Sequence, residues 1–519
     1  MNIPQPGRMA PADAAPPARA PEAAETDAGG DAPGTLRRLA RRHGAFGAIL
    51  LVGAAVRADA LIGYRGVLRT PDSTRYLANA LHLAPGTVRP SGYSVMLWLL
   101  EPLHSLTVVV AVQLVMGLAI GIAGYALLVR RGLPGWGATI AMAPVLLSAS
   151  AVQLEHFLLS DTLFDLLVIA AVTLIGWWRQ PPIWAHAAAG LLIAAATLTR
   201  SEGTPLLIAF VIYLIAGFAG WRTLIGIAVL GVSFAAPVAG YATWYEQVHG
   251  RFEVTSSTGA FLYGAAATFA DCASIRPPAT ERALCPTAPV RDRMWSDYYV
   301  FGGPISALPG GSFGQRADTL GSDFALRAIR AQPLAYLSAV ARSFWQNFQP
   351  PVTGHPNSAI QRNQLLHQNE YRFPAGPPPP ARSGTARLYA AYNHEPAGPV
   401  LRVIQPYADW LRAYQRYLIV PGPLLGVILA IGLAGLLAGW RQFGGEALLP
   451  WLVGMALLAT PAMIAEAYPR YLVGDVPVLC VAAGLAIPRI AAAIRQGLRR
   501  AGGDAPLTGR LTGPASTDG

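Results

Sequence analysis

The chain has 519 residues, of which 53% are hydrophobic and only 13% are charged, and its mean hydropathy is +0.38. A soluble protein of this length would carry about 25% charged residues, so the composition excludes an ordinary soluble enzyme and predicts a polytopic membrane protein. The formal net charge of +11 comes from arginine alone, because the sequence contains no lysine. Several arginines lie in short loops and in both tails, where they orient membrane proteins, and we expect no nucleic-acid partner.

The N-terminus, residues 1–44, is rich in Ala, Pro, Gly and acidic residues at its start and lacks apolar periodicity. This composition predicts a disordered tail, and the absence of a short apolar core after a basic start argues against a signal peptide. A basic run from Arg37 to Arg42 then adjoins the first apolar segment. By the positive-inside rule the N-terminus is expected to be cytoplasmic.

Ten apolar segments follow, most of them near the ~20 residues that cross a bilayer as a helix. They are 45–63, 106–129, 134–152, 161–178, 183–199, 204–219, 223–245, 416–439, 447–465 and 472–493. Arginine, alone or beside tryptophan, follows the second, fourth, sixth, eighth and tenth segments. If the helices alternate, all five arginine groups fall on the N-terminal, cytoplasmic side.

This count predicts an all-α, multi-pass protein of the plasma (inner) membrane with about 10 transmembrane helices and a large mixed loop region outside. The expected divisions are a cytoplasmic tail (1–44), an N-terminal transmembrane module (45–245), an extracytoplasmic loop region (246–415), C-terminal transmembrane helices (416–493) and a second cytoplasmic tail (494–519). The inverted orientation is the alternative, but it would place the arginine-rich tails outside.

Two of the three cysteines share the polar region that this topology places outside. Cys272 and Cys285 are therefore expected to form a disulfide, which requires an oxidising compartment. Two unpaired loop cysteines are the alternative. Cys480 lies inside an apolar segment and is expected to be part of the core.

The first outer loop holds the best candidate for a catalytic group. Asp72 lies between Pro71 and Ser73, close to Arg75, and Arg89 follows in the same loop. A carboxylate can take the proton of an acceptor hydroxyl while a phosphate leaves, and neighbouring arginines can hold that phosphate. The alternative for Asp72 is a turn or a helix N-cap, which Pro-Asp-Ser-Thr also fits.

The second outer loop carries Glu155, His156 and Asp161. We expect these groups to converge with Asp72 as support for the base, as acceptor ligands, or as a divalent-metal site. No ligand spacing is diagnostic, so the metal stays unknown and no cofactor is certain. The alternative is that Ser160 caps the next helix and Asp161 stabilises its positive end.

Two further turns place charges near membrane depth, where unpaired charges are costly and usually functional. Arg200 and Glu202 lie between two short apolar segments, and Arg470 precedes Tyr471 at the start of the last one. These residues are candidates for binding a lipid phosphate. The alternatives are a structural Arg–Glu pair and interfacial anchoring by tyrosine and arginine.

The loop motifs together resemble the GT-C superfamily of polyprenyl-phosphate-dependent glycosyltransferases, in particular the family 39-like relatives of protein O-mannosyltransferases and aminoarabinose transferases. The motifs that carry the resemblance are Pro71-Asp72-Ser73…Tyr76, Arg89-Pro90-Ser91-Gly92-Tyr93, Glu155…Ser160-Asp161, Leu198-Thr199-Arg200-Ser201-Glu202-Gly203 and Pro469-Arg470-Tyr471. The resemblance covers about residues 45–493. Protein O-mannosyltransferases typically show Asp-Glu in the first loop, whereas Ser73 follows Asp72 here, so a glycan or lipid acceptor is at least as plausible as a protein.

The resemblance implies an inverting transfer of a sugar, mannose or arabinose by analogy, from a polyprenyl-phosphate donor in the bilayer to an extracytoplasmic glycan, lipid or protein. It implies Asp72 as general base, with Glu155 and Asp161 nearby. The candidate substrate-binding residues are Arg75, Tyr76, Arg89, Tyr93, His156, Arg200, Glu202, Arg470 and Tyr471. The rival functions are a membrane transporter or flippase and a non-catalytic envelope-assembly protein.

Overall fold

The structure is a computed structural model and describes residues 32–349, 373–376, 383–396, 398–439, 445–464 and 469–503. Helices dominate it, and the only strands in this part of the chain are β1 (Tyr64–Gly66) and β2 (Leu401–Val403). The prediction of an all-α fold is confirmed. A helical fold suits a bilayer because each helix satisfies its backbone hydrogen bonds internally.

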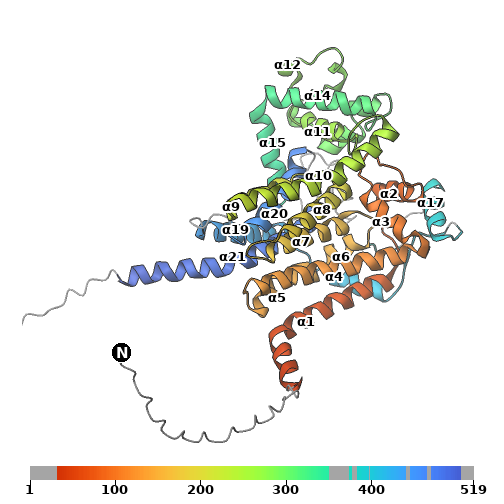
Figure 1. The fold of residues 1–519 in the computed structure, drawn as a ribbon. Coiled ribbons are helices and arrows are strands. Elements are labelled where there is room, and N and C mark those ends of the chain that lie inside the picture. The colour runs from red at the N-terminus through yellow and green to blue at the C-terminus, as the bar shows by residue number, and fades with distance from the viewer. Residues whose placement is uncertain are drawn as a thin grey trace, which may run out of the picture.

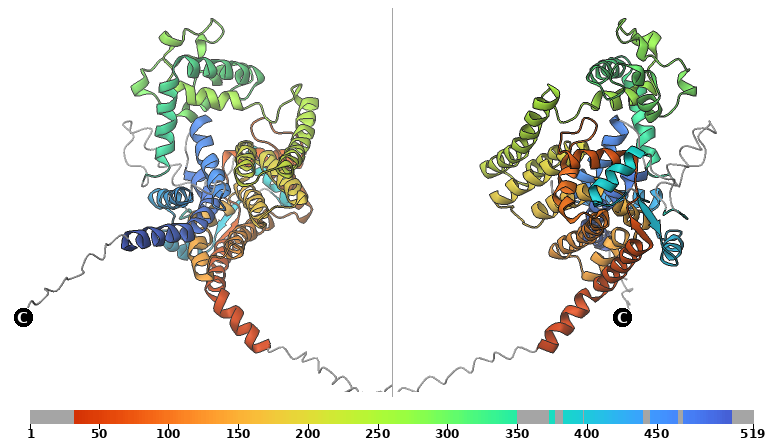
Figure 2. Two further views of the ribbon diagram at one scale, coloured as in Figure 1. Left: turned by 60° about the vertical axis from the view of Figure 1, so that its left-hand side comes forward. Right: turned by 90° about the vertical axis from the view of Figure 1, so that its right-hand side faces the viewer.

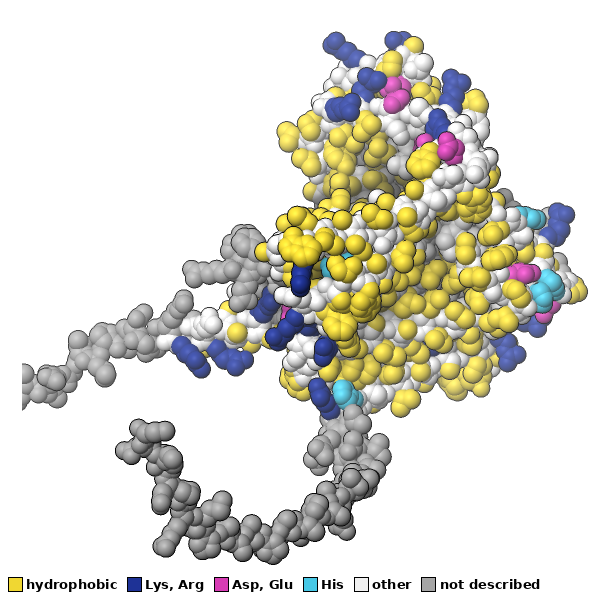
Figure 3. Space-filling view, in the orientation of Figure 1, with side chains coloured by type: hydrophobic (Ala, Val, Ile, Leu, Met, Phe, Trp, Pro, Cys, Tyr) yellow, Lys and Arg dark blue, Asp and Glu magenta, His cyan; other side chains and the backbone are white. Residues whose placement is uncertain are grey.

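Eleven helices, which we call the membrane body, coincide with the predicted apolar segments. They are α1 (Ala32–Gly63), α4 (Leu106–Arg130), α5 (Gly135–Leu147), α6 (Ala149–His156), α7 (Asp161–Gly176), α8 (Ile183–Thr199), α9 (Leu206–Gly217), α10 (Trp221–His249), α19 (Gly422–Ala438), α20 (Leu448–Ile464) and α21 (Pro469–Gly503). Figure 3 shows hydrophobic side chains over much of the body's surface.

Not all of these helices are long enough to match the predicted count of ten membrane spans. Among the described residues, α1, α4, α10 and α21 contain stretches long and apolar enough to cross a membrane. The bent pair α5–α6 makes a fifth candidate, with a 47° change of direction at the break between the two helices. Four further apolar helices have 10–17 residues. Each predicted segment is therefore helical, but ten full crossings are not confirmed.

The outer segments form shorter elements. They are α2 (Pro71–Leu81), α3 (Gly92–Leu100), α11 (Thr258–Ala267), α12 (Cys272–Ile275), α13 (Ser296–Phe301), α14 (Gln315–Ala331), α15 (Pro333–Gln346), α17 (Ser383–Asn393) and α18 (Tyr407–Tyr414), with 3-10 turns η1 (Glu101–Leu103), η2 (Ser201–Gly203), η3 (Arg282–Leu284), η4 (Val290–Asp292) and η5 (Pro304–Ala307).

Helices α11 to α15 form a lobe beside the membrane body (Figures 1 and 2). The lobe has its own hydrophobic core, built around side chains such as Tyr263 and Phe324, both fully buried. Cys272 and Cys285 form a disulfide at its edge, with their Cα atoms 6.1 Å apart.

Residues 383–415 do not join this lobe. Instead β2 pairs antiparallel with β1, with Arg402 opposite Arg65, and α17 packs against α2. The side chains of Tyr392 and Leu401 are buried in the same core as Tyr64 and Tyr93. The predicted loop region 246–415 therefore packs as two parts, one in the lobe and one against the N-terminal module.

Helix α21 brings the two ends of the membrane body together, because it packs against α4, α5, α7, α19 and α20. The first turn of α21 holds Arg470, and the first turn of α7 holds Asp161. This packing places residues about 310 positions apart in sequence at one site.

Candidate active site

Asp72 lies in the first turn of α2, where its neighbours already satisfy the helix start. Thr70 is the N-cap residue, Pro71 is the first helical residue, and the Ser73 hydroxyl accepts a hydrogen bond from the Thr70 amide at 2.9 Å. Asp72 therefore follows the cap instead of forming it. Its carboxylate is directed to other partners.

Those partners are three arginines. Asp72 lies 3.4 Å from Arg89 and 3.6 Å from Arg470, measured to guanidinium nitrogens, and 4.0 Å from Arg75 one turn further along α2. Burial alone would raise the pKa of Asp72, but the charges of Arg89, Arg470 and Arg75 outweigh it and lower the pKa below its ordinary value. Asp72 is thus held as a carboxylate.

A second carboxylate, Asp161, lies at the start of α7 beside Arg200 and Arg470. Arg470 donates from Nε to Asp161 at 2.9 Å, and Arg200 donates to the same carboxylate oxygen. Arg200 also donates to Glu202 at 3.2 Å. Arg470 therefore links Asp72 to Asp161, and Arg200 links Asp161 to Glu202.

The resulting cluster contains four guanidinium groups and three carboxylates from five separate segments. Its arginines are Arg75, Arg89, Arg200 and Arg470, and its acids are Asp72, Asp161 and Glu202. Burying this many charges is costly unless they are paired or bind a ligand. Around Asp72 itself three arginines surround one carboxylate, and this local excess of positive charge favours an anionic ligand.

Two carboxylates adjoining the cluster, half-buried Asp165 and buried Asp475, were not singled out from the sequence. Asp165 lies one turn after Asp161 in α7, and Asp475 lies in α21; both line a small pocket with Arg200 and Arg470. One oxygen each of Asp475, Asp161 and Glu202 has no hydrogen-bond partner among the described residues. The sequence signal was available, since both aspartates interrupt apolar segments.

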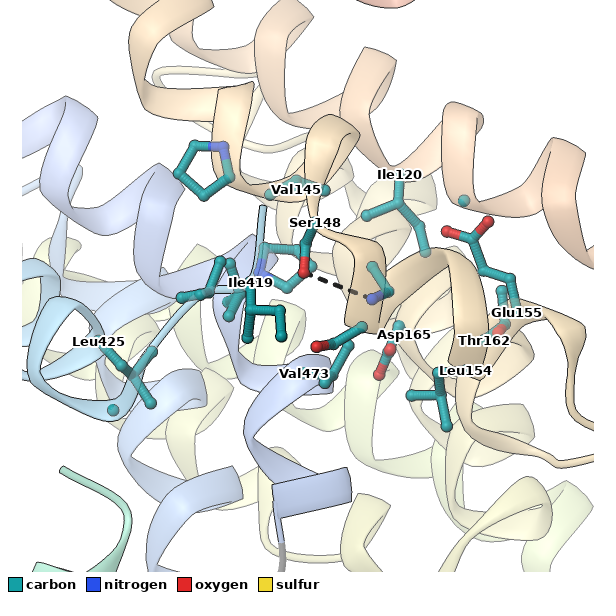
Figure 4. A pocket seen from close by; sticks show the side chains of 18 residues that line it. Ile120, Val145, Ser148, Leu154, Glu155, Thr162, Asp165, Ile419, Leu425 and Val473 are labelled. Carbon is teal, nitrogen blue, oxygen red and sulfur yellow. Dashed lines mark hydrogen bonds between the residues drawn. The ribbon is translucent and has the colours of Figure 1, made fainter. Parts of the chain in front are cut away.

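Asp165 also lines a second, mostly apolar pocket of about 120 Å³ between α4, α5, α6, α7, α21 and the start of α19 (Figure 4). Figure 4 shows Asp165 next to the labelled side chains Leu154, Thr162 and Val473. The charged pocket and the apolar pocket therefore share one wall. The charged pocket is lined by two arginines, Arg200 and Arg470, and by four acidic side chains, which are Asp161, Asp165, Glu202 and Asp475.

The structure does not bring Glu155 into the arginine cluster. Its two carboxylate oxygens accept hydrogen bonds from Arg57 at 2.6 and 2.7 Å, and both side chains are buried. His156 is also buried, with Nε2 2.7 Å from the Tyr64 carbonyl oxygen. These contacts join the last turn of α6 to Arg57 within α1 and to β1, and they support the fold there.

Tyr76 and Tyr93 are buried beside the cluster and contact each other edge to face at 5.0 Å between ring centroids. The Tyr76 hydroxyl lies 2.9 Å from that of Ser160, and Tyr93 donates to Gln113 at 2.6 Å. Burial raises the pKa of Tyr76 to about 12. These two tyrosines lie in the core next to the site and support it by packing. The side chain of Tyr471 lies outside the described part of the structure.

Two motif glycines allow close packing next to the arginines. A Cβ on Gly92 would lie 2.5 Å from the Leu198 carbonyl oxygen, so only glycine lets α3 approach the end of α8 just before Arg200. A Cβ on Gly203 would lie 2.6 Å from the Thr197 amide nitrogen. These glycines shape the loops that hold the cluster.

The acidic groups of this site include oxygens suited to a divalent cation. Among the described residues, however, no three of their ligand atoms lie within 4.8 Å of one another. Ion pairing with arginine is therefore the arrangement that the structure shows.

No family model matches the chain, and no curated protein matches it in sequence. Solved structures that resemble it include the oligosaccharyltransferase AglB from Archaeoglobus fulgidus, in complex with an inhibitory peptide and a dolichol-phosphate, at 13% identity and a TM-score of 0.39. That match covers 89% of this chain and 52% of AglB, so the chain spans about half of AglB's length.

ArnT from Cupriavidus metallidurans, in the apo state, is a further match at 14% identity and a TM-score of 0.30, covering 86% of this chain and 78% of ArnT. Both matches are similarities of fold over most of this chain. At these levels of similarity no residue's role is taken from them, and the site is interpreted from its own side chains.

Proposed function

We propose that the chain is a membrane glycosyltransferase that moves a sugar from a polyprenyl-phosphate donor to an acceptor hydroxyl outside the cytoplasm. The observation that carries this proposal is the position of Asp72 among Arg75, Arg89 and Arg470. Asp72 can take the proton of the acceptor hydroxyl while the arginines hold the phosphate that leaves. A mannosyl or arabinosyl donor is the first choice, from the resemblance of the loop motifs.

In the proposed reaction the acceptor oxygen attacks the anomeric carbon and its proton passes to Asp72. The bond between the anomeric carbon and the phosphate oxygen breaks, and polyprenyl phosphate leaves with the electron pair. Arg470, Arg200 and Arg89 stabilise the negative charge by charge-assisted hydrogen bonds. Inversion at the anomeric carbon follows from a single displacement.

The two adjoining pockets support a lipid-linked donor. The apolar pocket would take the first isoprene units, and the phosphate would bind to Arg89 and Arg470 beside Asp72, with Asp165 in the wall shared by the two pockets. Asp161 and Glu202 would hold Arg200 and Arg470 in position until the phosphate arrives. In this proposal Asp161 is a positioning residue, and Glu155, paired with Arg57 away from the cluster, takes no part in the transfer.

The experiment is sugar transfer in membranes from radiolabelled polyprenyl-phosphate mannose and, separately, polyprenyl-phosphate arabinose. Asp72→Asn is expected to reduce transfer about 100-fold to 10,000-fold, the usual contribution of a general base. Asp292→Asn, at an exposed surface pair with Arg291, is the matched control and should keep wild-type transfer. Undiminished transfer by a well-expressed Asp72→Asn enzyme would remove Asp72 as base.

One observation favours a transporter as the second candidate. Asp165 and Asp475 are carboxylates inside apolar helices, where ionisable groups often form substrate or ion pathways. Uptake or flipping of a fluorescent polyprenyl-phosphate analogue in proteoliposomes separates the two functions. A transporter would move the analogue without transferring sugar, and Asp165→Asn with Asp475→Asn would stop the movement.

A further inference from the structure

Three potential metal ligands gather on the outer surface away from the arginine cluster. Glu101, His104 and His394 each offer a ligand atom, and these atoms all lie within 4.8 Å of one another. Glu101 Oε1 is 3.4 Å from His394 Nε2 and 3.9 Å from His104 Nδ1. Tetrahedral zinc, with bonds of about 2.0–2.1 Å, holds its ligand atoms about 3.3 Å apart, so the cluster is near coordination geometry.

The ligands come from two segments that are far apart in the chain. Glu101 and His104 lie at η1, just before α4, whereas His394 follows α17. Figure 3 shows histidine and acidic side chains together at the edge of the molecule where α17 lies. A metal bound here would join residues almost 300 positions apart.

Neighbouring contacts already hold these two segments together. The Leu106 amide donates to the Asn393 side-chain oxygen at 3.0 Å, and the Tyr392 hydroxyl donates to the Leu97 carbonyl oxygen at 2.7 Å. Both contacts cross the same junction as the cluster. The backbone positions of the three ligands are therefore set before any metal binds, which lowers the cost of binding.

We propose that Glu101, His104 and His394 form a zinc site that fastens the segment after α17 to the start of α4. Imidazole nitrogen suits zinc and related transition metals, whereas magnesium and calcium prefer oxygen ligands. Water would complete the coordination at the exposed side. This site is separate from the arginine cluster and does not depend on the proposed sugar transfer.

The histidine rings are stacked, with centroids 3.5 Å apart and planes at 25°. Each ring must turn about its χ2 angle to direct a nitrogen at a shared metal. The side chains of His104 and His394 are 43% and 54% exposed, so neighbouring groups leave room for this rotation.

The test is zinc binding by the purified full-length protein, prepared with an affinity tag that contains no histidine and stripped with EDTA. Titration against a chromophoric zinc chelator should show one site that the His104→Ala/His394→Ala double variant weakens at least 10-fold. Glu101→Gln, which keeps the side-chain size, should also weaken it. His82→Ala is the control, because His82 is an exposed histidine outside the cluster.

Hydrogen exchange gives a second readout on the same samples. Zinc should slow exchange in residues 383–396 of the wild type and of His82→Ala, but not of Glu101→Gln. If the double variant fails to fold, Glu101→Gln decides the question. The proposal is overturned if the wild type binds no zinc, or if Glu101→Gln and the folded double variant bind it as tightly as the wild type.

Discussion

Asp72 is surrounded by positive charge, and this limits its strength as a base in the enzyme without donor. A carboxylate with a lowered pKa accepts a proton less readily. A donor phosphate would compete for Arg470 and Arg89, since phosphate is a strong partner for guanidinium groups. Donor binding would then weaken the contacts that stabilise the Asp72 carboxylate and raise its pKa in the complex.

This account predicts two different acid limits of activity. Because the pKa of Asp72 is lowered from 3.8 in the free protein, Asp72 loses its charge only as the pH falls below that value. The kcat/KM for donor should therefore not fall on account of Asp72 between pH about 7 and about 5. The acid limit of kcat, which reports the complex, should lie at higher pH.

The variant Arg75→Gln tests whether the neighbouring arginines lower the pKa of Asp72. Arg75 is 43% exposed and lies 4.0 Å from Asp72, so its loss should move the acid limit of kcat/KM to higher pH while the fold is retained. Steady-state rates across the pH range are the measurement. If kcat/KM instead reached its acid limit at a higher pH than kcat, donor binding would not raise the pKa of Asp72 as proposed.

Glu155 and Arg57 form a buried pair, and removing one member leaves the other charged and unpaired. Glu155→Ala should lower stability by about 3–5 kcal/mol, whereas Arg57→Met/Glu155→Leu should cost much less. Thermal unfolding in detergent measures both. A Glu155→Gln enzyme that is as stable as wild type yet inactive would instead support the catalytic role predicted from the sequence.

The residue types of the site could be predicted from the sequence, but their partners could not. Asp72 was identified as a carboxylate among arginines in the first outer loop, and Arg200 and Arg470 were identified as charges near membrane depth. The pairing of Glu155 with Arg57 was not foreseeable, because Arg57 lies within α1 and meets Glu155 only after α1 packs against α6.

At the scale of helices, the site depends on how closely α3 approaches α8. The Gly92 Cα faces the backbone of Leu198 and Thr199, and Ser91 holds the preceding loop by donating to the Ala84 carbonyl oxygen at 2.8 Å. This loop also carries Arg89. The Arg-Pro-Ser-Gly-Tyr motif therefore contributes Arg89, which we propose binds the donor phosphate, and several packing positions.

Gly92→Ala should separate α3 from α8, because its new Cβ would lie 2.5 Å from the Leu198 carbonyl oxygen. We expect a loss of stability of about 1–3 kcal/mol and weaker donor binding, since Arg89 and Arg200 would move apart. Gly240→Ala in α10 is the control, because nothing lies within 4 Å of its added Cβ. Equal thermal midpoints and donor affinities for the two variants would contradict this packing argument.

Helix ends were predicted less well than helix existence. The third predicted segment, 134–152, is divided between α5 and α6 at Ser148, whose hydroxyl caps α6 by accepting from the Ala151 amide. Hydropathy continues through this break, since serine and alanine interrupt it only weakly. The bend could therefore not be predicted from apolar length alone.

At the scale of the whole molecule, the described chain consists of the membrane body, the lobe of α11 to α15, and the segment 383–415 that returns to the N-terminal module. We propose that the lobe and the arginine cluster face the extracytoplasmic side and that both termini are cytoplasmic. The arginines that follow alternate apolar segments support this orientation.

Cysteine labelling in intact cells tests the orientation. Asp292→Cys in the lobe should react with a membrane-impermeant maleimide, whereas Arg179→Cys, between α7 and α8, should react only after permeabilisation. Both positions are exposed. The native cysteines give little background, because Cys272 and Cys285 are bonded and Cys480 is buried. The opposite pattern would show that the topology is inverted.

The all-helical fold could be predicted because apolar length is a strong signal in a membrane protein. The division of residues 246–415 could not, because β2 meets β1 and α17 meets α2 through contacts between segments more than 300 residues apart. Such pairings leave little trace in composition or periodicity.

The most direct test of the central claim compares donor binding and single-turnover transfer in the same preparations of wild type, Asp72→Asn and Arg470→Ala. The account predicts that Asp72→Asn binds donor at least as tightly as wild type but transfers sugar at least about 100-fold more slowly. Arg470→Ala should instead bind donor more weakly. Transfer by Asp72→Asn at the wild-type rate, with donor bound, would contradict the assignment of Asp72 as the base.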